Sequence, residues 1–173
     1  MSEAAKQSGI CEEIFEDHDE KPTRSLLFNL VTGMQVHGDA GSYYMDMPLN
    51  HKIFLAQFDA IRSIADKGPC VIVGRCADYV LRDDPNVALV NLFVHAPLAA
   101  RIRRESARTN TTPAEAEKRI RQVDKERAAY YNFFSSKRWG DAQAYDLCVN
   151  TDGLEISEVA KLVLRYLELR GLR

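Results

Sequence analysis

The stretch LVNLFVHAPLAARIRRESAR, residues 89–108, decides the fold of this chain. Its first part, 89–94, is a short run that is apolar on both faces and rich in residues that favour strands. A helix predicted over 97–108 starts directly after this run. A strand that is apolar on both faces and runs into a helix is typical of a parallel sheet that helices cover.

Two further runs extend this pattern. Cys70–Val73 is β-branched and is closed by Gly74, and the run 146–149 follows much later in the chain. Helical stretches separate the three runs. Strands that alternate with helices in this way predict an α/β fold, with a parallel sheet and helices on both of its faces.

Three more helices are predicted from local signals. The segment 48–67 repeats apolar residues at helical spacing before a Gly-Pro stop. A long helix over 112–135 begins with the capping box TPAE, in which proline takes the first helical position. The segment 156–167 carries one apolar stripe and is predicted as an amphipathic helix.

Composition restricts the class of protein. The chain has 173 residues, with 23 Lys and Arg against 25 Asp and Glu, so its formal charge is −2. A near-neutral balance argues against a strongly basic protein that binds a nucleic acid polymer, and 46% apolar residues describe one ordinary globular domain over 1–173. No segment approaches the roughly 18 apolar residues of a membrane helix. We therefore expect a cytoplasmic protein without membrane contact, whose oligomeric state is open.

The four cysteines are scattered and form no CxxC pair. Cys70 and Cys148 lie inside apolar runs, so we expect them to be buried and reduced. Cys76 stands beside an arginine, but no histidine base is near it in the sequence.

The strongest chemical signal is a concentration of arginines on two predicted helices. Arg101 and Arg104 are three residues apart on the first helix, and Arg121, Asp124 and Arg127 are each three apart on the second. Arginines presented together bind phosphate oxygens, and a carboxylate among them fixes their orientation or accepts from a substrate group. The alternative is a solvated helix face, with ion pairs between neighbouring turns.

Arg75 and Asp78 follow the first predicted strand. In open α/β sheets ligands bind beyond the carboxyl ends of strands, so both side chains are candidates for contact with a ligand. The alternative is that Arg75 ends the strand and pairs with Asp78, Asp83 or Asp84. A dense aromatic group farther along the chain also has two interpretations, which are stacking on a nucleotide base and packing in the core. Its members are Tyr130, Tyr131, Phe133, Phe134 and Trp139.

Four blocks together resemble the cytidylate kinase-like family of nucleoside monophosphate kinases, which have the P-loop NTPase fold. They are CVIVGRCADYVL (70–81), LFVHAPLAARIRR (92–104), RIRQVDKERAAYYNFF (119–134) and YDLCVNT (145–151). The resemblance implies a three-layer parallel sheet with helices on both faces over 70–173. It also implies a helical lid at about 105–140 and a helical acceptor-side region at 10–67. The implied reaction transfers the γ-phosphoryl group of ATP, with Mg²⁺, to a pyrimidine nucleoside monophosphate such as CMP.

The resemblance also assigns roles on the donor side. Arg101 and Arg104 would border the ATP site, with Arg104 the contact to phosphate. Arg121, Asp124 and Arg127 match the catalytic pattern of a lid that closes over both nucleotides and excludes water. No residue is implied as a protein ligand for a metal.

On the acceptor side, Arg75 would bind the phosphate of the nucleoside monophosphate, and Asp78 would orient that phosphate or its base. Better-known cytidylate kinases have an acid directly after this arginine. Cys76 stands there in this sequence, which leaves the preferred base open.

The chain departs from the family at its beginning, because it contains no G-x-x-x-x-G-K-[ST] motif. We interpret it as lacking the family's first strand and phosphate-binding loop. That strand would lie between the runs 70–73 and 89–94, so these runs either close up or leave backbone groups unpaired. The departure also favours a second hypothesis, a non-catalytic nucleotide-binding or interaction module that keeps the acceptor and lid residues.

Overall fold

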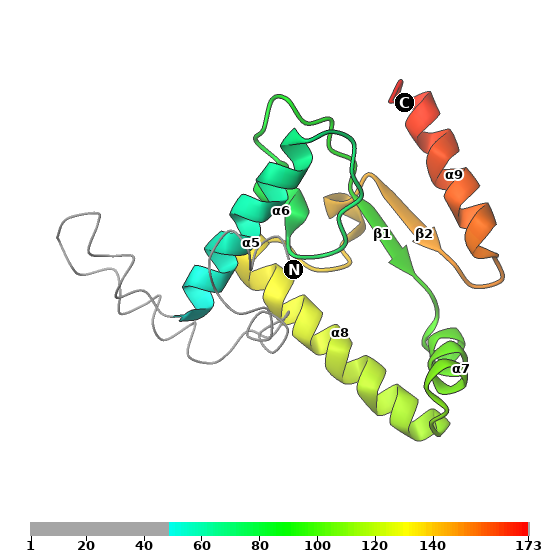
Figure 1. Cartoon of the computed structure of the whole chain (residues 1–173). Helices are drawn as coiled ribbons and strands as arrows, with labels where there is room; N and C mark the ends of the chain where they lie inside the picture. Colours follow the sequence, from blue (N-terminus) through cyan, green and yellow to red (C-terminus); the bar gives the residue numbers. More distant parts are fainter. Residues whose placement is uncertain (1–48, 173) are drawn as a thin grey trace.

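The computed structural model describes residues 49–172, which form an α/β fold with a small parallel sheet (Figure 1). The part of the predicted helical region 10–67 that precedes residue 49, and Cys11, lie outside these residues. The described elements are α5 (Leu49–Asp66), α6 (Ala77–Leu81), β1 (Leu92–His95), α7 (Leu98–Thr109), α8 (Pro113–Ser135), the 3₁₀ turn η2 (Ala142–Ala144), β2 (Leu147–Asn150) and α9 (Ile156–Leu169).

The two strands of the described sheet are parallel neighbours. Leu92 is opposite Leu147, and His95 is opposite Asn150. The predictions of strands at 89–94 and 146–149 are confirmed in type, with each strand placed one to three residues later along the chain. β1 leads directly into α7, as predicted (Figure 1).

The predicted strand at Cys70–Val73 is wrong. These residues have no strand assignment, and the side chains of Val71 and Val73 are 93% and 87% exposed. β-branched residues favour a strand only where a neighbouring strand supplies ladder hydrogen bonds and packing. Within 49–172 no strand pairs with this run, so its strand propensity is not expressed.

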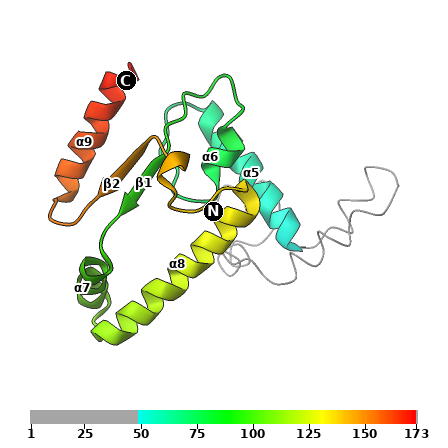
Figure 2. The ribbon, with the colours of Figure 1, turned by 180° about the vertical axis from the view of Figure 1, so that it is seen from behind.

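Helices α7 and α8 follow each other directly, are joined by a short turn (Figures 1 and 2) and pack against each other. Asn110 ends α7 in the left-handed conformation, with φ of 52°. The predicted capping box starts α8. The Thr112 side chain accepts from the Glu115 amide at 3.3 Å, and the Glu115 carboxylate accepts from the Thr112 amide at 2.9 Å. These signals lie close together in the chain, which is why α7 and α8 begin and end nearly where predicted.

The core lies where α5, α6 and the second half of α8 meet. The rings of Phe54 and Phe134 stack with centroids 3.7 Å apart, joining α5 to α8. Tyr130 and Tyr131 are buried with Cys76 in the same cluster, so core packing accounts for the aromatic group of α8. A second cluster, around Ile61, joins α5 to α6.

Helix α9 lies beside β2, on the side of the sheet away from α5 and α6 (Figures 1 and 2). Its bounds agree with the predicted amphipathic helix, but no residue of α9 is buried. The Tyr166 hydroxyl donates to the Asp146 carbonyl at 3.2 Å, and Arg170 pairs with Asp146 at 3.0 Å. Polar contacts at the start of β2 therefore hold the end of α9.

The expected burial of two cysteines is wrong. Cys70 and Cys148 are exposed, whereas Cys76 is 3% exposed. Cys70 lies in the unpaired run. Cys148 is on the outward face of β2. The next residue, Val149, points to the opposite face and is the only buried residue of this strand. None of the helices between residues 49 and 172 combines the length and the apolar character that crossing a membrane requires.

Candidate functional site

An open cavity of about 370 Å³ lies between α7 and α8. Five arginines and one glutamate contribute to its wall, together with two apolar side chains. The lining residues are Arg101, Arg104, Glu105, Arg108, Arg119, Ile120, Val123 and Arg127. Clustered guanidinium groups present planar forks of donors that match phosphate oxygens, so the charge and chemistry of this cavity favour a phosphorylated ligand.

A two-pronged ion pair fixes one wall of the cavity. Arg101 Nη1 donates to Asp124 Oδ2 at 2.8 Å, and Arg101 Nη2 donates to Asp124 Oδ1 at 2.7 Å. Both side chains are partly buried. The hydrogen bond to Asp124 is the main cause of a raised pKa for the Arg101 guanidinium. Asp124 therefore fixes the orientation of Arg101 across the two helices.

Arg104 connects the cavity to the sheet. Its Nη1 donates to Thr151 Oγ1 at 3.1 Å, and its Nη2 donates to the Thr151 carbonyl at 2.8 Å. The Thr151 amide in turn donates to the carbonyl of His95, the last residue of β1, at 2.9 Å. Arg104 thus lies at the carboxyl ends of both strands, where α/β folds bind their ligands.

Arg121 lies on a different face of α8 from the cavity. It pairs with Glu117, one turn earlier, at 2.7 Å, and it does not line the cavity. For Arg121 the structure therefore shows the alternative given above, an ion pair between neighbouring turns on a solvated helix face. Arg127 does line the cavity, so the structure brings Arg101, Arg104 and Arg127 together, with Asp124 bonded to the first of them.

Three further residues line the cavity without having been predicted from the sequence: Glu105, Arg108 and Arg119. Glu105 accepts from Arg108 at 3.0 Å, and its carboxylate is 3.7 Å from Arg119 on α8. The spacing of Arg101, Glu105 and Arg108 by four and three residues places them on one face of α7. That spacing was the available signal, whereas the approach of Arg119 depends on how the two helices pair.

The other predicted residues, Arg75 and Asp78, lie at the start of α6. Gly74, Arg75 and Cys76 are three consecutive residues with positive φ, of 73°, 59° and 52°. The left-handed conformation costs a non-glycine residue roughly 1–2 kcal/mol, so tertiary packing must hold this turn in place. The burial of Cys76 is part of that packing.

Asp78 is bonded to α8. Its Oδ2 accepts from the Tyr131 hydroxyl at 2.8 Å and is 3.9 Å from Lys137 Nζ. Burial, followed by the hydrogen bond to Asp78, raises the pKa of Tyr131. The phenol therefore stays protonated and donates to the carboxylate over the physiological pH range.

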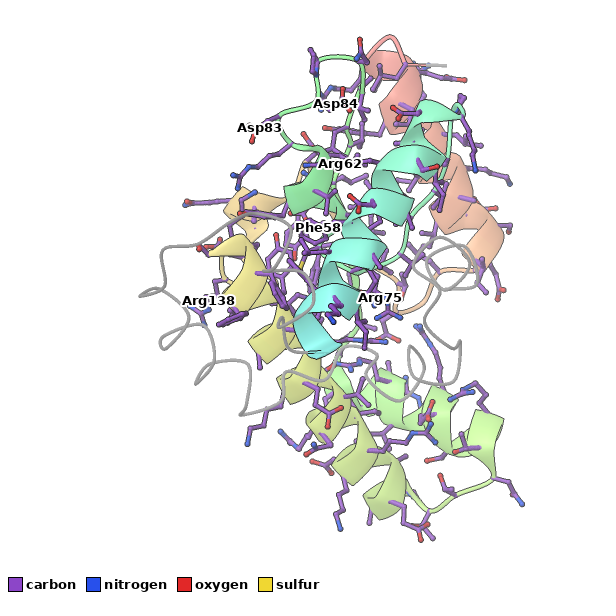
Figure 3. The ribbon with its side chains drawn as sticks, turned by 60° about the vertical axis from the view of Figure 1, so that its left-hand side comes forward. Phe58, Arg62, Arg75, Asp83, Asp84 and Arg138 are labelled. Atoms are coloured by element: carbon purple, nitrogen blue, oxygen red, sulfur yellow. The ribbon has the colours of Figure 1, made fainter. Side chains whose placement is uncertain are left out.

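Two of the carboxylates considered as partners of Arg75 lie elsewhere. Figure 3 shows Asp83 and Asp84 on the loop after α6, well away from Arg75. Asp83 pairs with Arg82 at 2.8 Å, and Asp84 accepts from the Asn86 amide at 2.9 Å. The structure therefore separates Arg75 from both.

Helix α8 connects the two groups of predicted residues. Arg127 lines the cavity, and Tyr131, which binds Asp78, comes four residues later on the same helix. Residues four apart lie on one helix face with a rise of about 6 Å between them. We call the cavity between α7 and α8 the arginine cavity, and Arg75 and Asp78 the Asp78 group. Along α8, the contacts of the two are consequently one helical turn apart.

Comparison with known proteins gives the family. A family model described as the cytidylate kinase-like family matches residues 1–153. The chain belongs to the cytidylate kinase-like family. The matched region contains both groups of residues, the arginine cavity and the turn at Gly74.

Two curated relatives are similar to this cytidylate kinase-like chain. They are proteins named cytidylate kinase from two strains of Saccharolobus islandicus, each 29% identical over 103 residues. The match covers 57% of this chain and 51% of each relative, so the chain spans about half the length of the curated relatives it matches.

A solved structure is also similar. It is the crystal structure of an uncharacterized protein from Eubacterium ventriosum, with 29% sequence identity and a TM-score of 0.63. The match covers 69% of this chain and 74% of that one. A solved fold therefore resembles more than half of this member of the cytidylate kinase-like family.

Proposed function

We propose that this chain belongs to an enzyme that transfers the γ-phosphoryl group of ATP to a nucleoside monophosphate such as CMP. The observation that carries the proposal is the placement of Arg127 and Tyr131 on adjacent turns of α8. Phosphoryl transfer requires donor and acceptor held close together, with positive charge around the phosphoryl group. A helix that borders both an arginine cavity and the Asp78 group meets that requirement.

In this proposal the arginine cavity is the donor side. Arg104 and Arg127 contact phosphate oxygens and neutralise the charge that develops during transfer. Asp124 holds Arg101 in place, and Arg121, which pairs with Glu117 on another face of α8, is proposed to reach the phosphates only when the lid closes. The α7–α8 pair and the following segment, about 105–140, form the lid that excludes water around the reacting groups.

The acceptor side of the proposal is built on Arg75 and Asp78. Arg75 binds the phosphate of the nucleoside monophosphate, and Asp78 orients that phosphate or the base. The Tyr131 hydroxyl fixes the Asp78 carboxylate through their 2.8 Å hydrogen bond. The whole chain is proposed as one domain of three layers, with helices on both faces of the parallel sheet and the helical region 10–67 on the acceptor side.

Magnesium enters this reaction as part of the substrate MgATP. In the part of the chain that the structure describes, no three His, Cys, Asp or Glu side chains are grouped as metal ligands. Mg²⁺ keeps several of its waters and is commonly held through substrate phosphates together with few carboxylates. The arginines would therefore bind oxygens of the phosphate chain that Mg²⁺ leaves available.

A substrate panel tests the proposal. The chain is incubated with MgATP and each of CMP, dCMP, UMP, AMP and GMP, and ADP formation is followed. We expect the highest kcat/KM for a pyrimidine monophosphate, and a loss of about 100-fold or more in Arg127→Gln. Arg165→Gln removes the same charge from the exposed face of α9 and should change kcat/KM by less than about twofold. If none of the five monophosphates increases the rate of ADP formation, the proposal is wrong.

A non-catalytic nucleotide-binding module is the second candidate. It is favoured by the sequence, which contains no G-x-x-x-x-G-K-[ST] motif. Such a module would bind CMP tightly in the absence of ATP and would form no ADP. Calorimetric titration with CMP, combined with the turnover assay, separates the two candidates.

A further inference from the structure

The end of the arginine cavity nearest the α7–α8 turn has a charge arrangement that the proposed function does not use. Glu105 and Arg108 come from α7, and Arg119 comes from α8. The Glu105 side chain is 18% exposed, whereas those of Arg108 and Arg119 are 67% and 63% exposed. A shielded carboxylate therefore lies between two accessible guanidinium groups.

The contacts of Glu105 reach both helices. Arg108 Nε and Nη2 donate to its two carboxylate oxygens at 3.1 and 3.0 Å, and Arg119 Nε is 3.7 Å from Oε1. Long arginine side chains lose considerable rotamer freedom when they bind an anion, and a fixed counter-ion removes part of that cost in advance. Glu105 thus supplies a common counter-ion for Arg108 and Arg119 at this end of the cavity.

The cavity consequently has two arginine groups along α7. Arg101 and Arg104 lie toward the sheet, and Arg108 lies one turn from Arg104, a rise of about 6 Å. A single phosphate contacts one of these groups, whereas a chain of linked phosphates extends from one to the other. The length of the cavity therefore matches a polyphosphate chain better than an isolated phosphate.

We propose that Arg108 and Arg119 bind a second phosphate group of the nucleotide at this end of the cavity, with Glu105 as their positioning residue. The ligand class is a di- or triphosphate chain that spans the cavity from Arg104 to Arg119. This proposal rests on the proposed function, because it deepens the donor side of that site. Its test uses inorganic polyphosphates and does not require turnover.

The first experiment measures discrimination by chain length. Calorimetry at low ionic strength gives the affinity of the chain for orthophosphate, pyrophosphate and tripolyphosphate. We expect tripolyphosphate to bind about tenfold or more tightly than orthophosphate. Arg119→Gln and, separately, Arg108→Gln should each weaken tripolyphosphate binding about tenfold and leave orthophosphate binding within about twofold.

Arg103→Gln is the matched control. Arg103 is an exposed arginine of α7 that pairs with Asp152 at 3.6 Å and does not line the cavity. Its substitution removes the same charge from the same helix, so we expect less than about a twofold change for all three anions. If Arg108→Gln and Arg119→Gln behave like Arg103→Gln, or weaken all three anions equally, the proposal is wrong.

The positioning role of Glu105 has a readout of its own. Glu105→Gln should weaken tripolyphosphate binding several-fold, and Glu105→Asp should recover most of the loss because it keeps the carboxylate. Tighter tripolyphosphate binding in Glu105→Gln would show that the carboxylate only repels the anion, and would overturn its role. If the chain shows the expected preference for tripolyphosphate but does not phosphorylate CMP, the proposed function is wrong and the polyphosphate site stands.

Discussion

Arg101 on α7 and Asp124 on α8 form a two-pronged ion pair with nitrogen–oxygen distances of 2.7 and 2.8 Å. One turn nearer the loop, Glu105 on α7 approaches Arg119 on α8 at 3.7 Å, with the charges exchanged between the helices. A slip of one turn between α7 and α8 would bring like charges opposite each other. The alternation therefore specifies the pairing of the helices that form the arginine cavity.

Substitution of Asp124 by Asn should destabilise the chain. The pair is partly buried, so we expect a loss between the values for exposed and buried pairs, about 1–2 kcal/mol in the free energy of unfolding. Urea denaturation measures the loss. Asp152→Asn, which removes the exposed partner of Arg103, is the control and should cost less than about 0.5 kcal/mol. Equal losses of unfolding free energy in the two variants would contradict the larger contribution expected of the Arg101–Asp124 pair.

Stability should fall at alkaline pH because of Tyr131. The folded state raises the pKa of this phenol above its usual value of 10.0, mainly through burial. Below about pH 10 both folded and unfolded states keep the proton, whereas above it the unfolded state ionises first and stability decreases. Urea midpoints measured between about pH 8 and about pH 11 should therefore fall less steeply in Tyr131→Phe than in the unmodified chain. Parallel curves would refute this assignment.

The start of α8 depends on the hydroxyl of Thr112. Thr112→Ala leaves the Glu115 amide without its capping acceptor and should cost about 1 kcal/mol. Thr112→Ser keeps the hydroxyl and should recover most of this stability. The hydrogen bond from Thr112 lowers the pKa of Glu115, so the contribution of the capping box is present above the ordinary value of 4.5 and is lost as pH falls through the folded-state pKa. Thermal unfolding of both variants near neutral pH measures the cap.

Thiol reactivity should follow burial. In a Cys11→Ser background, Cys70 and Cys148 are exposed and should react rapidly with an aromatic disulfide reagent. Cys76 is buried against Tyr130 and Tyr131 and should react only as the chain unfolds. Adding Cys70→Ser or Cys148→Ser should remove one rapid equivalent each. Three equally rapid equivalents would contradict the placement of Cys76.

The sequence predicted best those elements whose signals are local. The capping box at Thr112 and the apolar spacing of α5 and α9 each lie within a few turns of one helix, so the helices appear where expected. The strand at 70–73 failed because strand formation requires a partner, and a run of β-branched residues does not contain that information.

The candidate site shows the same division. Arg101, Arg104 and Arg127 were found because arginines repeat within helices, and the structure places all three on one cavity. Arg119 was missed because its approach to Glu105 is set by the pairing of two helices. The contact of Tyr131 with Asp78 joins residues 53 positions apart, so no spacing rule could have predicted it.

The short turn between α7 and α8 has a consequence for the order of folding. The arginine cavity is built from one continuous piece of chain, between Arg101 and Arg127. Contacts between residues close in sequence require little loop-closure entropy and form early, whereas distant contacts such as that of Asp78 with Tyr131 form late. We expect the arginine cavity to assemble first, as a nucleus on which the contact of Asp78 with Tyr131 forms later.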